Sequence, residues 1–161
     1  MRIFVECYSD TELIRFLGVA SRDVRHVGGK GKVIQQVRDQ ADAAGLIDED
    51  PRSPQPRDLR NYQIEKTAFG LNFLERNSAD RKRLVVVCPR LEDWIITRAA
   101  AAGLKLAKYS LPDDPSELHK IRIHTEPHRS NFRSLLQDLG NKDGSLQTIS
   151  DWLIPNRSTQ Y

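Results

Sequence analysis

The residues best suited to chemistry lie in one short stretch, from Gly45 to Pro51, with the sequence Gly-Leu-Ile-Asp-Glu-Asp-Pro. Side chains of an extended segment alternate between its two faces, so we expect Asp48 and Asp50 to point to the same side. Two carboxylates at the end of a strand supply the oxygen ligands that Mg²⁺ prefers. The same residue types are common in turns and at helix starts, so the stretch taken alone leaves both interpretations open.

A further acidic residue, Glu6, is expected at the end of another strand. Residues 2–7 form a short apolar run, rich in β-branched and aromatic residues, that is typical of a buried strand. A helix is predicted directly after it, with Ser9 and Glu12 as a capping box and Gly18 at its end. Because a charged residue is costly to bury without a partner, Glu6 is a candidate for the rim of the sheet.

The third candidate is the segment Gly28-Gly29-Lys30-Gly31-Lys32, which follows a strand predicted over residues 23–27. Glycines let a backbone approach a ligand closely or turn with positive φ. A helix is predicted from about Lys32 to Ala44, and the free amides at a helix N-terminus favour phosphate. The spacing is not that of a Walker A loop, and an ordinary glycine-rich turn is the alternative.

The strongest strand pattern covers residues 84–88, which are continuous and mostly β-branched, and we predict that this strand is central. Pro89 is expected in the first turn of the helix that follows, together with Glu92 and Asp93. Acidic residues there complement the helix dipole, a contribution of roughly 0.3–1 kcal/mol. The other interpretation is that Glu92 reaches the same rim as the other acids.

The order strand, helix, strand, helix, strand over the first fifty residues predicts an α/β fold whose open sheet has a mainly parallel core flanked by helices. In that arrangement Glu6, the Asp48–Asp50 pair and the Gly-Lys segment lie at one edge of the sheet. An Arg- and Pro-rich loop is expected over residues 52–60, followed by a hairpin over 62–67 and 71–75, for which a helix is the competing interpretation.

Residues 1–161 are expected to form a single domain, with an α/β core over 1–110 and a helical C-terminal extension over 111–161. The extension contains a short helix to about Lys120, a second that ends at Gly140 and a third that ends before Pro155. The tail over residues 156–161 is expected to fray.

Composition is that of an ordinary globular protein, with 39% hydrophobic and 29% charged residues and a net charge of +3, which permits nucleic acid as a partner. Cys7 and Cys88 have no partner at metal-ligand spacing, so they are interpreted as buried thiols of a reduced, cytoplasmic protein. A strand pattern begins at once after Met1, and no apolar run reaches membrane-spanning length, so neither a signal peptide nor a membrane partner is expected.

A glutamate that ends the first strand, a Gly-Lys-Gly segment after the second and Asp-x-Asp after the third together resemble the Toprim domain. That domain is found in topoisomerases, bacterial primases and OLD-family nucleases. The resemblance covers roughly residues 2–51, with the strand and helix over 84–93 as its continuation. One departure is Cys7, which stands where many members have glycine. With no topoisomerase tyrosine domain or primase zinc module, the chain resembles a stand-alone unit, near in outline to small nuclease or phage-defence relatives.

The resemblance implies metal-dependent phosphodiester chemistry on DNA or RNA. Asp48 and Asp50 would hold Mg²⁺ or Mn²⁺, Glu6 would be a second ligand or the group that transfers a proton, and Glu92 would help to hold a second ion.

In the same resemblance Lys30 and Lys32, with the amides of residues 28–31, would neutralise the scissile phosphate. The alternative function is a non-catalytic binding or regulatory module that docks to an ATPase or nuclease partner. A plain nucleotide-binding domain ranks last, because the ribose-binding acid of a dinucleotide fingerprint is missing.

Overall fold

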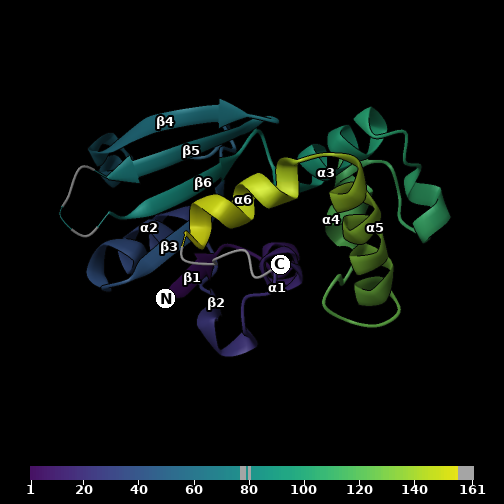
Figure 1. Ribbon diagram of the computed structural model, residues 1–161, viewed down its shortest axis with the longest axis horizontal. Coiled ribbons are helices and arrows are strands. Elements are labelled where there is room, and N and C mark those ends of the chain that lie inside the picture. Colours follow the sequence, from purple (N-terminus) through teal and green to yellow (C-terminus); the bar gives the residue numbers. More distant parts are fainter. Residues whose placement is uncertain (77–78, 80, 156–161) are drawn as a thin grey trace.

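A mixed sheet of six strands runs through the part of the chain that the computed structural model describes, residues 1–76, 79 and 81–155 (Figure 1). The order across the sheet is β2-β1-β3-β6-β5-β4. The strands are β1 (Arg2–Val5), β2 (Val24–His26), β3 (Ala43–Asp48), β4 (Tyr62–Ala68), β5 (Leu71–Arg76) and β6 (Arg83–Val87).

Neighbouring strands β2, β1, β3 and β6 are all parallel, whereas β5 and β4 form an antiparallel hairpin on the far side of β6. The predicted α/β fold, its parallel core, the hairpin and the interior position of the 84–88 strand are therefore confirmed. Because the four parallel strands share one direction, their carboxyl ends meet at a single edge. We refer to this as the carboxyl edge of the sheet.

Helices cover both faces of the sheet. Phe4, Ile47 and Leu84 pack against α2 on one face, whereas Ile3, Leu46 and their neighbours pack against the other helices on the opposite face. This division follows from the alternation of side chains along each strand. The helices are α1 (Tyr8–Phe16), α2 (Lys30–Asp39), α3 (Leu91–Ala101), α4 (Pro115–Lys120), α5 (His128–Lys142) and α6 (Ser145–Leu153).

Gly45 allows α2 to pack closely on β3. A Cβ at this position would lie 2.8 Å from Val33 Cγ1 and 2.9 Å from Leu84 Cδ2. Since real Cβ atoms do not approach other atoms that closely, any side chain here would push the helix off the strand. The glycine therefore helps to set the height of α2 above the strand that carries Asp48.

The predicted helix over 32–44 is wrong at both ends. It begins at Lys30 and ends at Asp39, and the alanines at its predicted end instead start β3, where Ala43 pairs with Arg2 and Ala44 with Ile3. Alanine favours helices, but propensity is a weak preference that strand pairing overrides.

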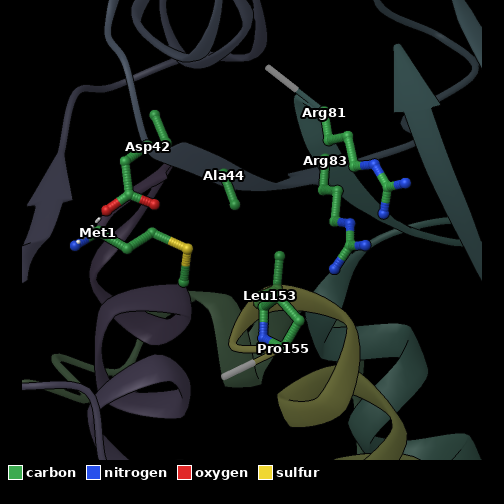
Figure 2. A pocket seen from close by; sticks show the side chains of 8 residues that line it. Met1, Asp42, Ala44, Arg81, Arg83, Leu153 and Pro155 are labelled. Carbon is green, nitrogen blue, oxygen red and sulfur yellow. Dashed lines mark ion pairs between the residues drawn. The ribbon is translucent and has the colours of Figure 1, made fainter. Parts of the chain in front are cut away.

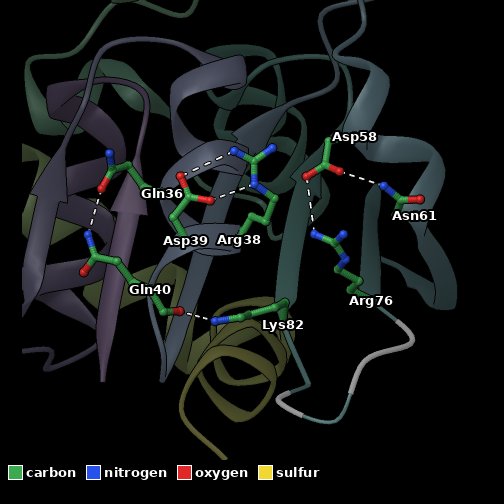
Figure 3. Close-up of polar contacts among 8 residues, drawn as sticks. All are labelled: Gln36, Arg38, Asp39, Gln40, Asp58, Asn61, Arg76 and Lys82. Carbon is green, nitrogen blue, oxygen red and sulfur yellow. Dashed lines mark hydrogen bonds and ion pairs between the residues drawn. The ribbon is translucent and has the colours of Figure 1, made fainter.

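Polar contacts fix the connections at the opposite edge of the sheet (Figure 3). Lys82, which is buried just before β6, donates a hydrogen bond to the carbonyl oxygen of Gln40 after α2. Asp58 accepts hydrogen bonds from Asn61 at 2.6 Å and from Arg76 of β5 at 3.5 Å. Part of the predicted 52–60 loop is therefore a 3₁₀ turn over Arg57–Asn61 that is attached to the sheet.

The C-terminal helices complete the apolar core. Trp152 of α6 donates from Nε1 to the carbonyl oxygen of Leu84 at 3.1 Å, and the Arg83 guanidinium lies 5.0 Å from the Trp152 ring. The predicted stop at Gly140 is wrong, because α5 continues to Lys142. The tail over 156–161 lies outside the described residues. None of the described helices is long and apolar enough to cross a membrane.

Candidate functional site

Glu6 and Asp48 meet at the carboxyl edge, where β1 and β3 end. The Asp48 amide donates to Glu6 Oε2 at 3.3 Å, and Asp48 Oδ1 accepts from the amide of Leu91 at 3.0 Å. Leu91 is the first residue of α3, so Pro89 lies before this helix and not in its first turn as predicted. Asp48 therefore joins the ends of two strands to the start of a helix.

Asp10 lies beside them, inside the first turn of α1. That helix begins at Tyr8, and the N-cap is Cys7, whose amide donates to Asp10 Oδ2 at 3.0 Å. The predicted capping box of Ser9 and Glu12 is wrong by two residues, because β1 ends at Val5 and the helix starts sooner. Asp10 is 1% exposed, and its Oδ1 has no hydrogen-bond partner among the described residues.

Glu92, in the first turn of α3, completes this group. It is buried, and its Oε1 lies 3.0 Å from Nδ1 of His119 at the end of α4. The charge of Glu92 raises the pKa of both Asp10 and Asp48. The structure thus brings together Glu6, Asp10, Asp48 and Glu92, which we call the acidic cluster.

Burial and the charges of neighbouring carboxylates make ionisation of Glu6, Asp10 and Asp48 unfavourable. Burial, followed by the charges of Asp10, Glu6 and Glu92, raises the pKa of Asp48 to about 9. Burial also raises the pKa of Asp10 to about 7, with smaller contributions from Glu6 and Glu92. The pKa of Glu6 is raised mainly by burial too. A cation placed among these groups would favour their charged forms.

The acidic cluster suits a divalent cation in the type of its ligand atoms and in its negative charge. Carboxylate oxygens are hard ligands, and the buried Asp10 Oδ1 has no hydrogen-bond partner within the described part of the chain. As the side chains stand, no three His, Cys, Asp or Glu residues of the described chain are grouped so that they could hold a metal ion. Coordination therefore requires these carboxylates to turn toward a common point.

Asp50 does not continue the alternation expected after Asp48. The strand ends at Asp48, the amide of Asp50 donates to the carbonyl oxygen of Pro89 at 2.8 Å, and Asp50 has a φ of 34°. The prediction that residues 48–50 are extended is therefore wrong. The hydrogen bond from the Asp50 amide to Pro89, which follows β6, accompanies a turn of the chain at Asp50. Its side chain lines a cavity of about 240 Å³ with Arg52 and Arg90, yet its charge still raises the pKa of Glu6.

Lys30 holds the loop that follows β3. Its Nζ donates to the carbonyl oxygen of Glu49 at 2.5 Å, to Gln55 Oε1 at 3.2 Å and to Ser53 Oγ at 3.4 Å. The side chain is 8% exposed, and its charge opposes the rise in the pKa of Glu6. Lys30 therefore supplies positive charge next to the acidic cluster while it anchors the segment that carries Asp50.

The glycine segment turns with positive φ and leaves space beside two of its Cα atoms. Gly28 and Gly29 have φ values of 75° and 139°, and a Cβ at either position would have nothing within 4 Å. Gly29 is the N-cap of α2, so Gly31 and Lys32 lie inside the first turn, where both are exposed. The structure thus leaves open space beside the Cα atoms of Gly28 and Gly29, which follow His26 in the chain.

Neither Asp10 nor His119 is among the site residues predicted from the sequence. Asp10 matches an acidic position of the motif that resembles the Toprim domain, but helix capping explains it equally well, and a metal role for His119 is disfavoured because the spacings of the nearby histidines lie across a proline. If the helix had been predicted to start two residues earlier, Asp10 would have been placed in its first turn, directly after β1. That position was the sequence signal that could have identified Asp10. His119 has no such signal, because its contact with Glu92 depends on how α4 packs against α3.

The opposite edge of the sheet carries a cavity of about 290 Å³ (Figure 2). It lies between the start of β3 and the end of α6, and Asp42 beside it pairs with the N-terminal amine at 2.8 Å. The sequence-predicted site residues do not line it. Comparisons of the chain with protein-family models, with curated proteins and with solved structures find no match.

Proposed function

We propose that the protein carries out phosphodiester chemistry on nucleic acid with a divalent cation, as a nuclease or a related processing enzyme. The single observation that carries the proposal is the acidic cluster, in which burial and the charges of neighbouring carboxylates raise the pKa of Asp10 and Asp48 at the carboxyl edge. Natural α/β sheets place ligand sites at this edge. Carboxyl groups whose pKa is strongly shifted by burial and by neighbouring charges cluster at functional sites.

The residues have distinct roles in this proposal. Asp48, Asp10 and Glu92 would hold Mg²⁺ or Mn²⁺ from the side of α1 and α3, and Glu6 would be a further ligand or the group that moves a proton. The bound ion would polarise a phosphoryl oxygen and lower the pKa of a bound water. Lys30 positions the loop that carries Asp50, from which that carboxylate would reach the same ion or a second one.

Phosphate would approach from the side of β2. Gly28 and Gly29 leave open space beside their Cα atoms at the N-terminus of α2, where free N–H groups and the helix dipole favour an anion. Lys32, exposed in the first turn, adds a charge that a phosphate can reach. The resemblance of the motif order to the Toprim domain supports the same assignment.

The test is cleavage of labelled DNA and RNA by the purified protein in Mg²⁺ or Mn²⁺. Asp48→Asn keeps the size of the side chain and removes its charge, so we expect it to abolish the divalent-dependent activity. Asp39→Asn, at an exposed carboxylate paired with Arg38 at the end of α2, is the matched control and should retain full activity. Activity that persists in Asp48→Asn, or that is unaffected by EDTA, contradicts the proposal.

A second candidate is a non-catalytic module that docks to an ATPase or nuclease partner. It is favoured by the lack of a ready three-ligand group in the described chain and by Lys30, whose Nζ already has three acceptors. Calorimetry separates the two functions. Binding of Mg²⁺ in the millimolar range together with turnover supports the enzyme, whereas an absence of binding supports the module.

A further inference from the structure

The cavity at the opposite edge of the sheet is separate from the acidic cluster. It has a volume of about 290 Å³ and lies beside Ala43 and Ala44 at the start of β3, whereas Asp48 ends that strand. A strand rises about 3.3 Å per residue, so roughly 16 Å of strand separates Ala43 from Asp48. A molecule bound in the cavity would therefore be a different ligand from one held at the carboxyl edge.

The guanidinium groups of Arg81 and Arg83 line one side of this cavity (Figure 2). The side chain of Arg83, the first residue of β6, is 18% exposed. Its guanidinium lies 5.0 Å from the ring of Trp152, and its Nη1 donates to the carbonyl oxygen of Trp152 at 3.3 Å. These contacts orient the planar group, and an oriented guanidinium is suited to bidentate binding of a carboxylate or a phosphate.

The ion pairs of the two arginines are long. Within the described residues both arginines share the carboxylate of Glu75 on β5, with 3.8 Å from Nε of Arg83 to Oε2 and 3.9 Å from Nε of Arg81 to Oε1. Both distances exceed the usual length of an N–H···O hydrogen bond, about 3.2 Å at most. The buried Nε of Arg83 has no hydrogen-bond partner in the described chain. One carboxylate thus faces two cations without a close contact, which leaves positive charge beside the cavity.

The rest of the lining is mostly apolar. In Figure 2 Met1 lies across from the arginines, and Leu153 and Pro155 lie below. Asp42 also lines the cavity, but its side chain is 72% exposed and pairs with the amine of Met1 at 2.8 Å, so solvent and this partner screen its charge. Ligand pockets combine apolar walls with a few placed polar groups, and their volumes begin at roughly 300 Å³. The cavity therefore suits a small molecule with an apolar body and one anionic group.

We infer that this cavity binds a small organic anion, whose phosphate or carboxylate group pairs with Arg81 and Arg83. The apolar part of the anion lies against Met1, Leu153 and Pro155. Phosphate and carboxylate both present two oxygens to the N–H fork of a guanidinium, so the chemistry that the site recognises is the oxyanion. This site lies outside the residues of the proposed function and does not depend on it.

The test uses phenyl phosphate and benzoate as probes, with phenol as their uncharged counterpart. Each compound is titrated at millimolar concentrations into isotope-labelled protein, in a buffer free of divalent cations, phosphate and carboxylates. Nuclear magnetic resonance follows the backbone amides. We expect at least one anion, but not phenol, to shift the amides of Ala43, Ala44 and Arg83. The anion that binds more tightly identifies the preferred oxyanion.

Arginine variants test whether the guanidinium groups hold the anion. Arg83→Met keeps an apolar side chain against Trp152 and removes the charged fork, so binding of the probe should weaken by roughly 10- to 150-fold. Arg81→Met changes a 77% exposed side chain and should weaken binding by roughly 2- to 5-fold. Arg22→Met, at an 88% exposed arginine outside the cavity, is the matched control and should bind as the original protein does.

The outcomes separate this inference from the proposed function. Unchanged affinity of Arg83→Met overturns the anion site, and if thermal melting shows that this variant does not fold, unchanged affinity of Arg81→Met overturns it. Equal binding of phenol, no shift with either anion, or shifts confined to Gly28 and Gly29 also overturn it. Binding of a probe in the cavity by a protein that cleaves no nucleic acid supports the anion site and removes the nuclease.

Discussion

The amide of Asp48 donates a hydrogen bond to Glu6 Oε2 across the ends of two parallel strands, at 3.3 Å. This contact favours the ionised form of Glu6, but burial outweighs it and the pKa of Glu6 is raised overall. The same carboxylate also raises the pKa of Asp48. The edge of the sheet thus holds acids together at a cost in stability, which is a common property of functional sites.

Removing the charge of Glu6 should therefore stabilise the metal-free protein. In Glu6→Gln the side-chain oxygen can still accept from the Asp48 amide, while repulsion with Asp48 and Asp10 is lost. We expect the melting temperature in EDTA to rise by about 2–4 °C, which corresponds to roughly 1 kcal/mol for a protein of this size. Differential scanning calorimetry measures it. Glu6→Ala, which leaves the amide without its acceptor, should not show the gain.

The stability of the metal-free protein should fall as pH rises. The folded-state pKa values of Asp10 and Asp48 lie at about 7 and about 9, above the value of about 3.9 for an unfolded aspartate. Between the unfolded-state pKa and each folded-state pKa, the folded protein binds more protons than the unfolded chain. Folding is therefore favoured at low pH, and this contribution to stability is lost as the pH rises through each folded-state pKa.

Urea unfolding in EDTA from pH 5 to pH 9 measures this dependence. Each such carboxyl contributes a slope of at most about 1.4 kcal/mol per pH unit. Asp10→Asn removes one of the two groups and weakens the repulsion on the other, so its profile should be flatter. A profile that rises over this interval in the original protein contradicts the assigned electrostatics.

A divalent cation should reverse that trend. Ligand carboxylates must be ionised, so Mg²⁺ should raise the melting temperature more at pH 8 than at pH 5, by an amount that grows with the Mg²⁺ concentration. Asp48→Asn should abolish the increase. Equal increases in both proteins would indicate a general salt effect, and NaCl of matched ionic strength provides the control.

Close packing at Gly45 gives a further prediction. A methyl group there would lie under 3 Å from both Val33 and Leu84, so Gly45→Ala should lower the free energy of unfolding by about 1–3 kcal/mol. Gly144→Ala, where the nearest atom to a Cβ is Phe69 Cζ at an ordinary 3.6 Å, is the control and should be milder. Urea denaturation of both variants measures the difference.

Much of the fold was predictable because the sequence patterns are local. The apolar runs that became β1, β3 and β6 and the helices between them fixed the parallel order, and that order placed Glu6 and Asp48 at one edge. Boundaries were less predictable. Ala43 and Ala44 favour a helix locally and enter β3 only because β1 provides a partner, which a local pattern does not contain.

The acidic cluster was only partly predictable, for the same reason. Glu6 and Asp48 follow strands, so their place was set by topology. At Asp50 the strand alternation ends because its amide pairs with the carbonyl oxygen of Pro89 beyond β6, and Lys30 donates to carbonyl and side-chain oxygens of a loop more than eighteen residues away. Such contacts depend on tertiary packing, and no spacing within the chain encodes them.

The role of Lys30 leads to the last prediction. Its Nζ has three acceptors in the loop after β3, so Lys30→Met should free that loop while it keeps the apolar stem of the side chain packed. Hydrogen bonds to charged groups contribute roughly 1.5–3 kcal/mol, and we expect a loss of about that size in urea unfolding. Lys32→Met, two residues further along the same helix and exposed, should leave the unfolding midpoint unchanged. In contrast, Lys32→Met should weaken nucleic acid binding and reduce its dependence on salt, because an exposed lysine that contacts phosphate releases counterions. If Lys30→Met leaves the stability unchanged and only weakens binding, Lys30 contacts phosphate and is not the anchor of the loop.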